Sequence, residues 1–325
     1  MQYFEVEGMR LPRICMGCWN ISGDATWGPQ DENDSLATFK AALDHGVNFF
    51  DTAPMYGQGY SEELLGRFLQ PLRSEVFIAT KSAQMRPADL IRSCEDSLRR
   101  LRTDYIDVFY LHWPDWQVPA GDTAGALLQL QRQGKIRAAA VSNFGVRDLT
   151  DMQSHLRPVV NQLAYSLLFR AIEHEILPLC RRVNVGVAPY SPLAEGLLAG
   201  RFRSAEDVPE GRARTRLFAG SRPQARHGEA GAEPEVFETI DVLCEKAGRL
   251  GCSLSQLALA WLLAQPGVPF AVVGARRPDQ LHQNVGALEL ELNGATCQEL
   301  AGATDDLKAK LGGNPDMWQA ASRIR

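Results

Sequence analysis

Short apolar runs alternate along the chain with longer stretches in which apolar residues recur every three or four positions. The runs are typical of strands buried on both faces, and the wider spacing is typical of helices that bury one side. We therefore expect strands near residues 13–18, 46–50, 75–80, 105–111, 137–142, 158–164, 185–190 and 269–273. Between and after them we expect helices near residues 36–43, 64–69, 90–101, 120–133, 146–156, 171–183, 235–250 and 277–287.

Strands that alternate with helices in this way predict an α/β protein, a (β/α)8 or TIM barrel, because each return to a parallel strand needs a right-handed crossover. A doubly wound sheet also alternates, but its usual glycine-rich turn after the first strand is absent here. The barrel uses most of the chain, so we expect a single domain over residues 1–325. The segment MQYFEVEGMRLP predicts an N-terminal β-hairpin that turns at Glu7 and Gly8.

Two segments interrupt the alternation. Residues 201–234 follow the seventh predicted strand and are rich in arginine, proline and glycine, which predicts a long active-site loop at the barrel rim. Such a loop either clamps an anionic ligand or is solvated and mobile, and the sequence leaves both open. After a polar helix from Thr296 to Lys310, the C-terminal tail either shapes a pocket at the barrel mouth or covers the outside of the barrel.

The composition argues against several kinds of partner and does not point to any other. A net charge of −5 and a pI near 5.8 give no electrostatic reason to expect nucleic acid or an anionic membrane. No apolar stretch approaches the length of a membrane span, and the N-terminus lacks the pattern of a secretory signal, so we expect a cytoplasmic protein. Seven scattered cysteines suggest no disulfide framework, and the lone CxxC of Cys15 and Cys18 lacks a second ligand pair for a metal.

Four polar residues close successive apolar runs at steps of 30, 31 and 31 residues: Asp51, Lys81, His112 and Asn143. That interval is the length of one strand–helix–strand unit. Because the carboxyl ends of parallel strands converge on one rim of a barrel, we expect these side chains to meet there.

Tyr56 lies in the loop that follows Asp51. A tyrosine is a poor acid near neutral pH unless its phenolate is stabilised. Lys81 would supply the stabilising charge, Asp51 would hold the lysine as a buried ion pair, and His112 would orient the reacting oxygen. Each residue alone has a simpler interpretation as a cap, a rim ion pair, a core histidine or a surface aromatic. Their coincidence at matching strand ends favours proton donation to a carbonyl oxygen.

In order along the chain, DTAPMYGQGYSEELLG, FIATK, DVFYLHWP, VSNFG, APYSPLAEGLLAGRF and VVGARRPDQLHQN resemble the aldo-keto reductase family. The resemblance covers essentially the whole chain. It implies a catalytic tetrad of Asp51, Tyr56, Lys81 and His112, with Tyr56 as the general acid.

The resemblance also implies a nicotinamide dinucleotide extended across the barrel rim. Ser142, Asn143 and Gln162 would bind the carboxamide, and Tyr190 would stack on the nicotinamide ring. The other implied cofactor contacts are Trp19, Asp51, Ser191, Pro192, Leu193, Gly196, Leu198, Arg201, Gly274, Arg276, Gln280 and Asn284. The pair Arg276-Arg277 at a helix start suits a 2′-phosphate, so NADPH is expected in preference to NADH.

Two positions depart from the family pattern: Gln283 replaces a frequent glutamate near the adenine, and Val273 a frequent proline. We expect an NADPH-dependent reductase of small aldehydes or ketones, sugar-like if Trp27, Trp113 and Trp116 form a pocket. One alternative is a cofactor-binding regulatory subunit, because some members of the family are partners of membrane channels. Another is a barrel enzyme that uses Lys81 as a Schiff-base nucleophile, against which the Asp51 pairing argues. The sequence indicates neither the oligomeric state nor the substrate.

Overall fold

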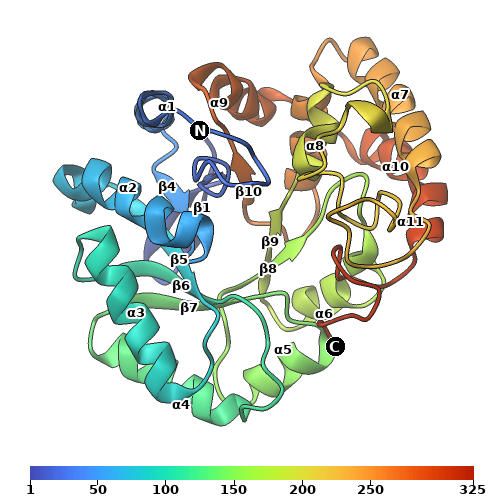
Figure 1. Cartoon of the computed structure of the whole chain (residues 1–325). Coiled ribbons are helices and arrows are strands. Elements are labelled where there is room, and N and C mark those ends of the chain that lie inside the picture. Colours follow the sequence, from blue (N-terminus) through green and yellow to red (C-terminus); the bar gives the residue numbers. More distant parts are fainter.

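The computed structural model describes residues 1–325 and contains eight parallel strands around a central axis (Figure 1). They are β3 (Ile14–Gly17), β4 (Phe49–Asp51), β5 (Phe77–Ser82), β6 (Ile106–Leu111), β7 (Ile136–Ser142), β8 (Val160–Ala164), β9 (Gly186–Tyr190) and β10 (Ala271–Gly274). Pairing runs in the order β10-β3-β4-β5-β6-β7-β8-β9. The last gap is bridged by a hydrogen bond from the Val187 amide to the Gly267 carbonyl at 2.8 Å, so the barrel is nearly closed. The predicted (β/α)8 fold is confirmed.

Helices surround the strands on all sides (Figure 1). Those that follow the barrel alternation are α1 (Glu32–Asp44), α2 (Tyr60–Leu69), α3 (Pro87–Leu101), α4 (Ala120–Arg132), α5 (Val146–Gln153), α6 (Ile176–Arg182), α8 (Leu254–Leu263) and α9 (Pro278–Val285). The helix α7 (Glu233–Arg249) precedes α8 in the same connection. The sequence predicted only the first of these two. In α8, nine of ten residues are buried, so it shows no polar face and no periodic pattern.

The N-terminal hairpin closes one end of the barrel. Strands β1 (Tyr3–Val6) and β2 (Met9–Pro12) pair antiparallel, and Glu7 and Gly8 turn between them with φ of 45° and 70°. Two left-handed residues are what the tightest hairpin turn requires. Met9 and Leu11 are buried in the apolar cluster inside the barrel, so the predicted hairpin acts as a plug opposite the strands' carboxyl ends.

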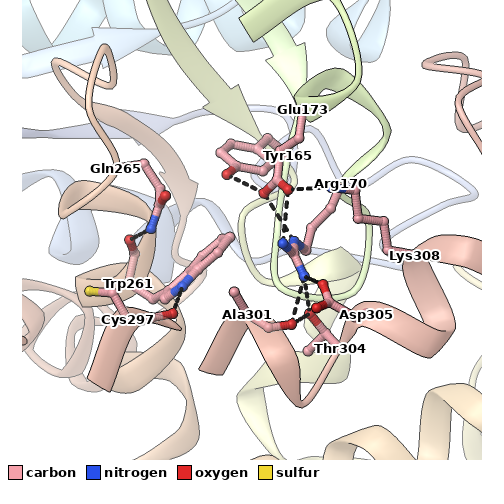
Figure 2. Close-up of polar contacts among 10 residues, drawn as sticks. All are labelled: Tyr165, Arg170, Glu173, Trp261, Gln265, Cys297, Ala301, Thr304, Asp305 and Lys308. Carbon is pink, nitrogen blue, oxygen red and sulfur yellow. Dashed lines mark hydrogen bonds and ion pairs between the residues drawn. The ribbon is translucent and has the colours of Figure 1, made fainter. Parts of the chain in front are cut away.

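The C-terminal helices are held by a buried polar network (Figure 2). The sequence predicted one helix over this region, and the structure has two, α10 (Gly294–Gly302) and α11 (Asp305–Leu311). The Arg170 guanidinium donates to the Ala301 carbonyl at the end of α10 and to the Asp305 carboxylate at the start of α11, at 2.7 and 2.8 Å. It also pairs with Glu173, which accepts hydrogen bonds from Tyr165 and Lys308 as well. One arginine thus stabilises the break between the two helices.

The long loop and the tail pack on each other beside the barrel mouth. Ala213, Leu217 and Phe218 are buried, and the Arg216 amide donates to the Met317 carbonyl at 2.9 Å. The Arg216 side chain binds the Leu311 and Asn314 carbonyls. The loop is therefore folded against the body of the protein, and the tail lies at the mouth as the first of its two alternatives predicted. No helix is long and apolar enough to cross a bilayer.

Candidate active site

A cavity of about 530 Å³ opens at the carboxyl ends of the strands. Its walls come from the loops after β3, β4, β6, β7 and β9, from the 201–234 loop, from the start of α9 and from the C-terminal tail. Polar side chains dominate, and four tryptophans line it: Trp19, Trp27, Trp113 and Trp318. In barrels of this kind, the carboxyl ends of the strands carry the active site, so this fold and cavity define an enzyme.

Lys81 is fully buried beneath the cavity floor at the end of β5. Its ammonium donates to the Asp51 carboxylate at 2.5 Å, to the Thr52 carbonyl at 2.9 Å and to the Tyr56 hydroxyl at 3.4 Å. Burial lowers the pKa of Lys81, but the charge of Asp51 and the Tyr56 oxygen outweigh it and raise that pKa to about 12. The lysine therefore carries a fixed positive charge directed at the tyrosine oxygen.

Asp51 connects Lys81 on β5 with Gln162 on β8. Its second oxygen accepts a hydrogen bond from the Gln162 amide at 2.8 Å. Both oxygens of this buried carboxylate are thus occupied, one by β5 and one by β8. These two donors fix the position of the carboxylate beside Lys81.

Tyr56 begins the short helix η1 (Tyr56–Gly59), in which Gly57, Gln58 and Gly59 have φ of 59°, 56° and 98°. These residues form a tight left-handed turn directly after Tyr56. Its ring stacks on Trp19 at 5.8 Å and meets His112 edge-on at 6.3 Å. Burial raises the pKa of Tyr56 more than the Lys81 charge lowers it, so the phenol holds its proton at neutral pH.

His112 lies at the end of β6 and is buried. Burial and then the Lys81 charge lower the pKa of His112 to about 3. The imidazole is therefore neutral near pH 7 and has one N–H to donate. The Asn143 amide binds the His112 carbonyl at 3.0 Å, which fixes the backbone behind the ring.

The four residues assigned to the nicotinamide form one hydrogen-bonded wall. The Tyr190 hydroxyl donates to the Asn143 amide oxygen at 3.0 Å, and the Ser142 hydroxyl donates to the Gln162 carbonyl at 3.0 Å. Asn143 holds a φ of 61°, a left-handed conformation that asparagine adopts more readily than most residues. Asn143 lies at the same barrel rim as Asp51 and His112, as the constant sequence interval predicted.

The structure gathers nearly all the other assigned cofactor residues on the cavity wall. Trp19, Asp51, Ser191, Pro192, Leu193, Gly196, Arg201, Gly274, Arg276, Gln280 and Asn284 all line it. Leu198 does not: it is fully buried in the core behind η4 (Ala194–Ala199). Its side chain packs inward and its amide donates to the Leu193 carbonyl at 3.1 Å, so the structure does not place Leu198 on the cavity wall.

Arg276 fastens two loops together. Its guanidinium donates to the Trp27 carbonyl at 2.6 Å, to the Gln30 side chain at 2.5 Å and to the Pro29 carbonyl. Arg277 is exposed and paired with Asp279. Nearby, the Gln280 amide nitrogen is buried without a hydrogen-bond partner. This end of the cavity offers unfilled donors and positive charge to a ligand.

Several cavity residues were not singled out from the sequence: Asp24, Thr26, Glu195, Gln224 and Gln319. Glu195 is the most unusual of them. It is 5% exposed, and neither carboxylate oxygen has a hydrogen-bond partner. Burial raises the pKa of Glu195 to about 8, although Arg214 and Arg212 act in the opposite direction. The only signal in the sequence was one charge inside the apolar stretch LAEGLLAG.

Similarity to known proteins agrees with this geometry. The sequence matches the aldo/keto reductase family over residues 13–304. It is 34% identical over 296 residues to aldo-keto reductase YhdN of Bacillus subtilis (strain 168), covering 86% of this chain and 87% of that protein. It is 31% identical over 310 residues to the NADH-specific methylglyoxal reductase of Escherichia coli (strain K12), covering 88% of this chain and 92% of that protein.

Solved structures share the fold. An aldo-keto reductase from Klebsiella pneumoniae in complex with NADPH has a TM-score of 0.72 and 31% identity, covering 90% of this chain and 91% of that chain. The glycerol dehydrogenase AKR11B4 from Gluconobacter oxydans has a TM-score of 0.77 and 31% identity, covering 94% of each chain. The chain belongs to the aldo/keto reductase family. It is an oxidoreductase of that type, which reduces carbonyl groups with a reduced nicotinamide dinucleotide.

Proposed function

We propose that this enzyme reduces small aldehydes or ketones with NADPH and that Tyr56 is its general acid. The observation that supports this most directly is the position of the Lys81 ammonium, 2.5 Å from Asp51 and 3.4 Å from the Tyr56 hydroxyl. When bound, the reduced dinucleotide supplies a hydride to the carbonyl carbon. Tyr56 donates its proton to the carbonyl oxygen, and solvent restores that proton after release of the alcohol.

Lys81 makes this proton transfer possible at neutral pH. As the phenol loses its proton, a negative charge develops on the tyrosine oxygen, and the buried ammonium stabilises it. The lysine pKa of about 12 keeps that charge in place. Neutral His112 donates its N–H to the substrate oxygen and orients it toward Tyr56. The fixed partners of Lys81 leave no free amine for Schiff-base chemistry.

The cofactor preference rests on the arginine-rich end of the cavity. Arg276 and Arg201 line it, and Arg277 follows at the start of α9. We assign the 2′-phosphate of NADPH to this end, where the exposed Arg201 can bind phosphate oxygens in pairs and Arg276, whose N–H groups bind loop carbonyls, adds positive charge. The unpartnered Gln280 amide suits the adenosine. The Klebsiella pneumoniae structure holds NADPH, whereas the Escherichia coli relative is NADH-specific, so this preference is decided by measurement.

We further propose that the substrate is a hydroxylated, sugar-like carbonyl compound and that residues 201–234 act as an active-site loop. Four tryptophans beside polar side chains suit the alternating C–H and O–H surfaces of such a molecule. One structural relative is a glycerol dehydrogenase. Trp116, also considered for this pocket, lies outside the cavity and is 48% exposed.

The test is the rate of NADPH oxidation with a panel of aldehydes and ketones, repeated with NADH. We expect turnover of small aldehydes and a higher kcat/KM for NADPH than for NADH. Tight NADPH binding without turnover of any carbonyl compound would instead favour the cofactor-binding regulatory subunit. Equal efficiency with the two cofactors would refute the assignment of the 2′-phosphate.

A further inference from the structure

A buried carboxylate behind the active site connects the strand that carries Lys81 with the turn that follows Tyr56. This carboxylate belongs to Glu62, which lies in the first turn of α2 and is 0% exposed. One of its oxygens accepts a hydrogen bond from the Thr80 hydroxyl at 2.6 Å, and the other accepts one from the Arg100 guanidinium at 2.6 Å. None of these three residues lines the cavity. The network therefore lies behind the residues that a bound molecule would touch.

Thr80 connects this network to Lys81. The two residues are neighbours on β5, and successive side chains of a strand point to opposite faces. Lys81 therefore points into the barrel, where it binds Asp51 and Tyr56. Thr80 points outward to α2, where it binds Glu62. This bond fixes the end of the strand at the residue that directly precedes the lysine.

Arg100 connects the network to the turn that follows Tyr56. Gly59, the last residue of that turn, has a φ of 98°, and a β-carbon there would lie 2.8 Å from Cδ of Arg100. The arginine stem therefore packs directly on the backbone of the turn. The helices α2 and α3 also meet at this arginine, because a β-carbon at Gly66 would lie 2.4 Å from the Arg100 carbonyl oxygen. Arg100 is thus held at its backbone and supports the turn with its side chain.

The residue before Glu62 binds the same group of strand ends. The Ser61 hydroxyl accepts a hydrogen bond from the Thr52 hydroxyl and donates one to the Cys18 carbonyl, both at 2.8 Å. The Thr52 carbonyl is in turn one of the acceptors of the Lys81 ammonium. The first turn of α2 therefore contacts the ends of three adjacent strands, β3, β4 and β5.

We propose that Glu62 and Arg100 are positioning residues for the general acid. They set the separation of the Tyr56 hydroxyl and the Lys81 ammonium, which is 3.4 Å. The lysine is connected to the Glu62 carboxylate through Thr80, and the tyrosine through the turn that packs on Arg100. The stabilisation of a phenolate by an ammonium falls with distance, so proton transfer depends on this separation. This inference rests on the proposed role of Tyr56 and adds the residues that hold it in place.

The experiment measures kcat, the KM for propanal and the Kd of NADPH for the wild type, Arg100→Met and Arg100→Lys. Methionine keeps most of the stem beside Gly59 but cannot bind Glu62, whereas lysine keeps both a long stem and a positive charge. Arg99→Met is the matched control, because Arg99 is the neighbouring arginine of α3, is 72% exposed and pairs with Asp96. The concentration of NADPH-binding sites gives kcat per folded molecule, and urea unfolding gives the stability of each variant.

We expect Arg100→Met to lower kcat by about tenfold or more, because a small displacement of a reacting group is costly to the rate. The KM and the Kd of NADPH should stay within about twofold, since neither residue reaches the cavity. Arg100→Lys should recover most of the lost activity, and Arg99→Met should match the wild type. A loss of stability in Arg100→Met with an unchanged kcat per binding site would overturn the proposal and leave the pair a purely structural contact.

A double-mutant cycle separates a loss that acts through Tyr56 from a general disturbance of the site. In Tyr56→Phe the general acid is already absent, so the additional substitution Arg100→Met should change the remaining turnover by less than about twofold. A further loss of about tenfold in the double variant would also overturn the proposal, because Arg100 would then act by another route. Undiminished turnover by Tyr56→Phe alone would instead overturn the proposed function itself, whatever the effect of Arg100→Met.

Discussion

Lys81 has no spare hydrogen-bonding capacity, because its three N–H groups are taken by Asp51, Thr52 and Tyr56. This explains how a cavity open to water can hold a strongly basic ammonium directly under a phenol. It also fixes the protonation state of the neighbouring histidine, because the Lys81 charge opposes a second positive charge at His112. The protonation states of Lys81 and His112 therefore depend on the charged groups beside them.

His112 links the site to acid stability. Its pKa is lowered from 6.5 to about 3, so between these values the unfolded chain binds a proton that the folded protein refuses. The free energy of unfolding must fall as pH drops through this window, by about 1.4 kcal/mol for each pH unit. We expect the wild type to lose about 2.5 kcal/mol more between pH 7 and pH 4.5 than His112→Gln does.

Urea unfolding at the two pH values measures this difference. His155→Gln, at an exposed position, is the matched control and should behave as the wild type does. An equal loss of stability in the wild type and in His112→Gln would contradict the neutral imidazole assigned to the site.

Local sequence patterns predicted only those site residues whose position follows from the spacing of the strands. Asp51, Lys81 and His112 end consecutive strands, so a constant interval was enough to bring them together. Tyr56 needed a motif, because it lies in a turn between two elements. Glu195 could not be found, because its burial depends on how distant segments fold around it, and no local periodicity records that.

At the level of elements, the network around Arg170 fastens α10 and α11 to the barrel. Arg170 and Glu173 are 7% and 15% exposed at their side chains, so neither can exchange its partner for water (Figure 2). Glu173→Gln leaves the guanidinium with one carboxylate partner fewer. We expect a loss of about 2 kcal/mol in the free energy of unfolding, the usual range for a broken buried network.

Chemical denaturation again provides the measurement. Glu245→Gln removes an ion pair with Arg249 in which both side chains are more than 70% exposed, and it should cost less than about 0.5 kcal/mol. Equal effects of the two substitutions would show that the network contributes no more than a surface pair.

Strands and helices were predicted well in the part of the chain where they alternate regularly, and poorly where one helix follows another. The strands lie within a few residues of the apolar runs because each run is a continuous buried segment. Helix α8 was missed since it is apolar on every side, and α10 and α11 were merged since only the distant Arg170 explains the break. Contacts between remote segments are invisible to local patterns.

For the whole molecule, the barrel supplies a constant rim, and the loop and tail give the cavity its particular shape. Trp318 from the tail lines this cavity, whereas Trp116 lies outside it. Trp318→Ala should raise KM for a small aldehyde about tenfold while leaving the Kd of NADPH within about twofold, because the tail forms the substrate end only.

Trp116→Ala is the matched control and should change neither constant. The measurements are steady-state kinetics and the quenching of protein fluorescence by NADPH. A large rise in the Kd of NADPH for Trp318→Ala would mean that the tail holds the cofactor and not the substrate.

The most direct test of the central claim is the turnover of Tyr56→Phe. This substitution removes one oxygen and leaves the Lys81–Asp51 pair and the ring contacts of Tyr56 in place. We predict that kcat for a small aldehyde falls by about a hundredfold or more, as expected for loss of a general acid, while NADPH binds as in the wild type. Tyr60→Phe, four positions along the chain and bonded to Glu32 outside the cavity, should keep full activity. Undiminished turnover by Tyr56→Phe would contradict the account.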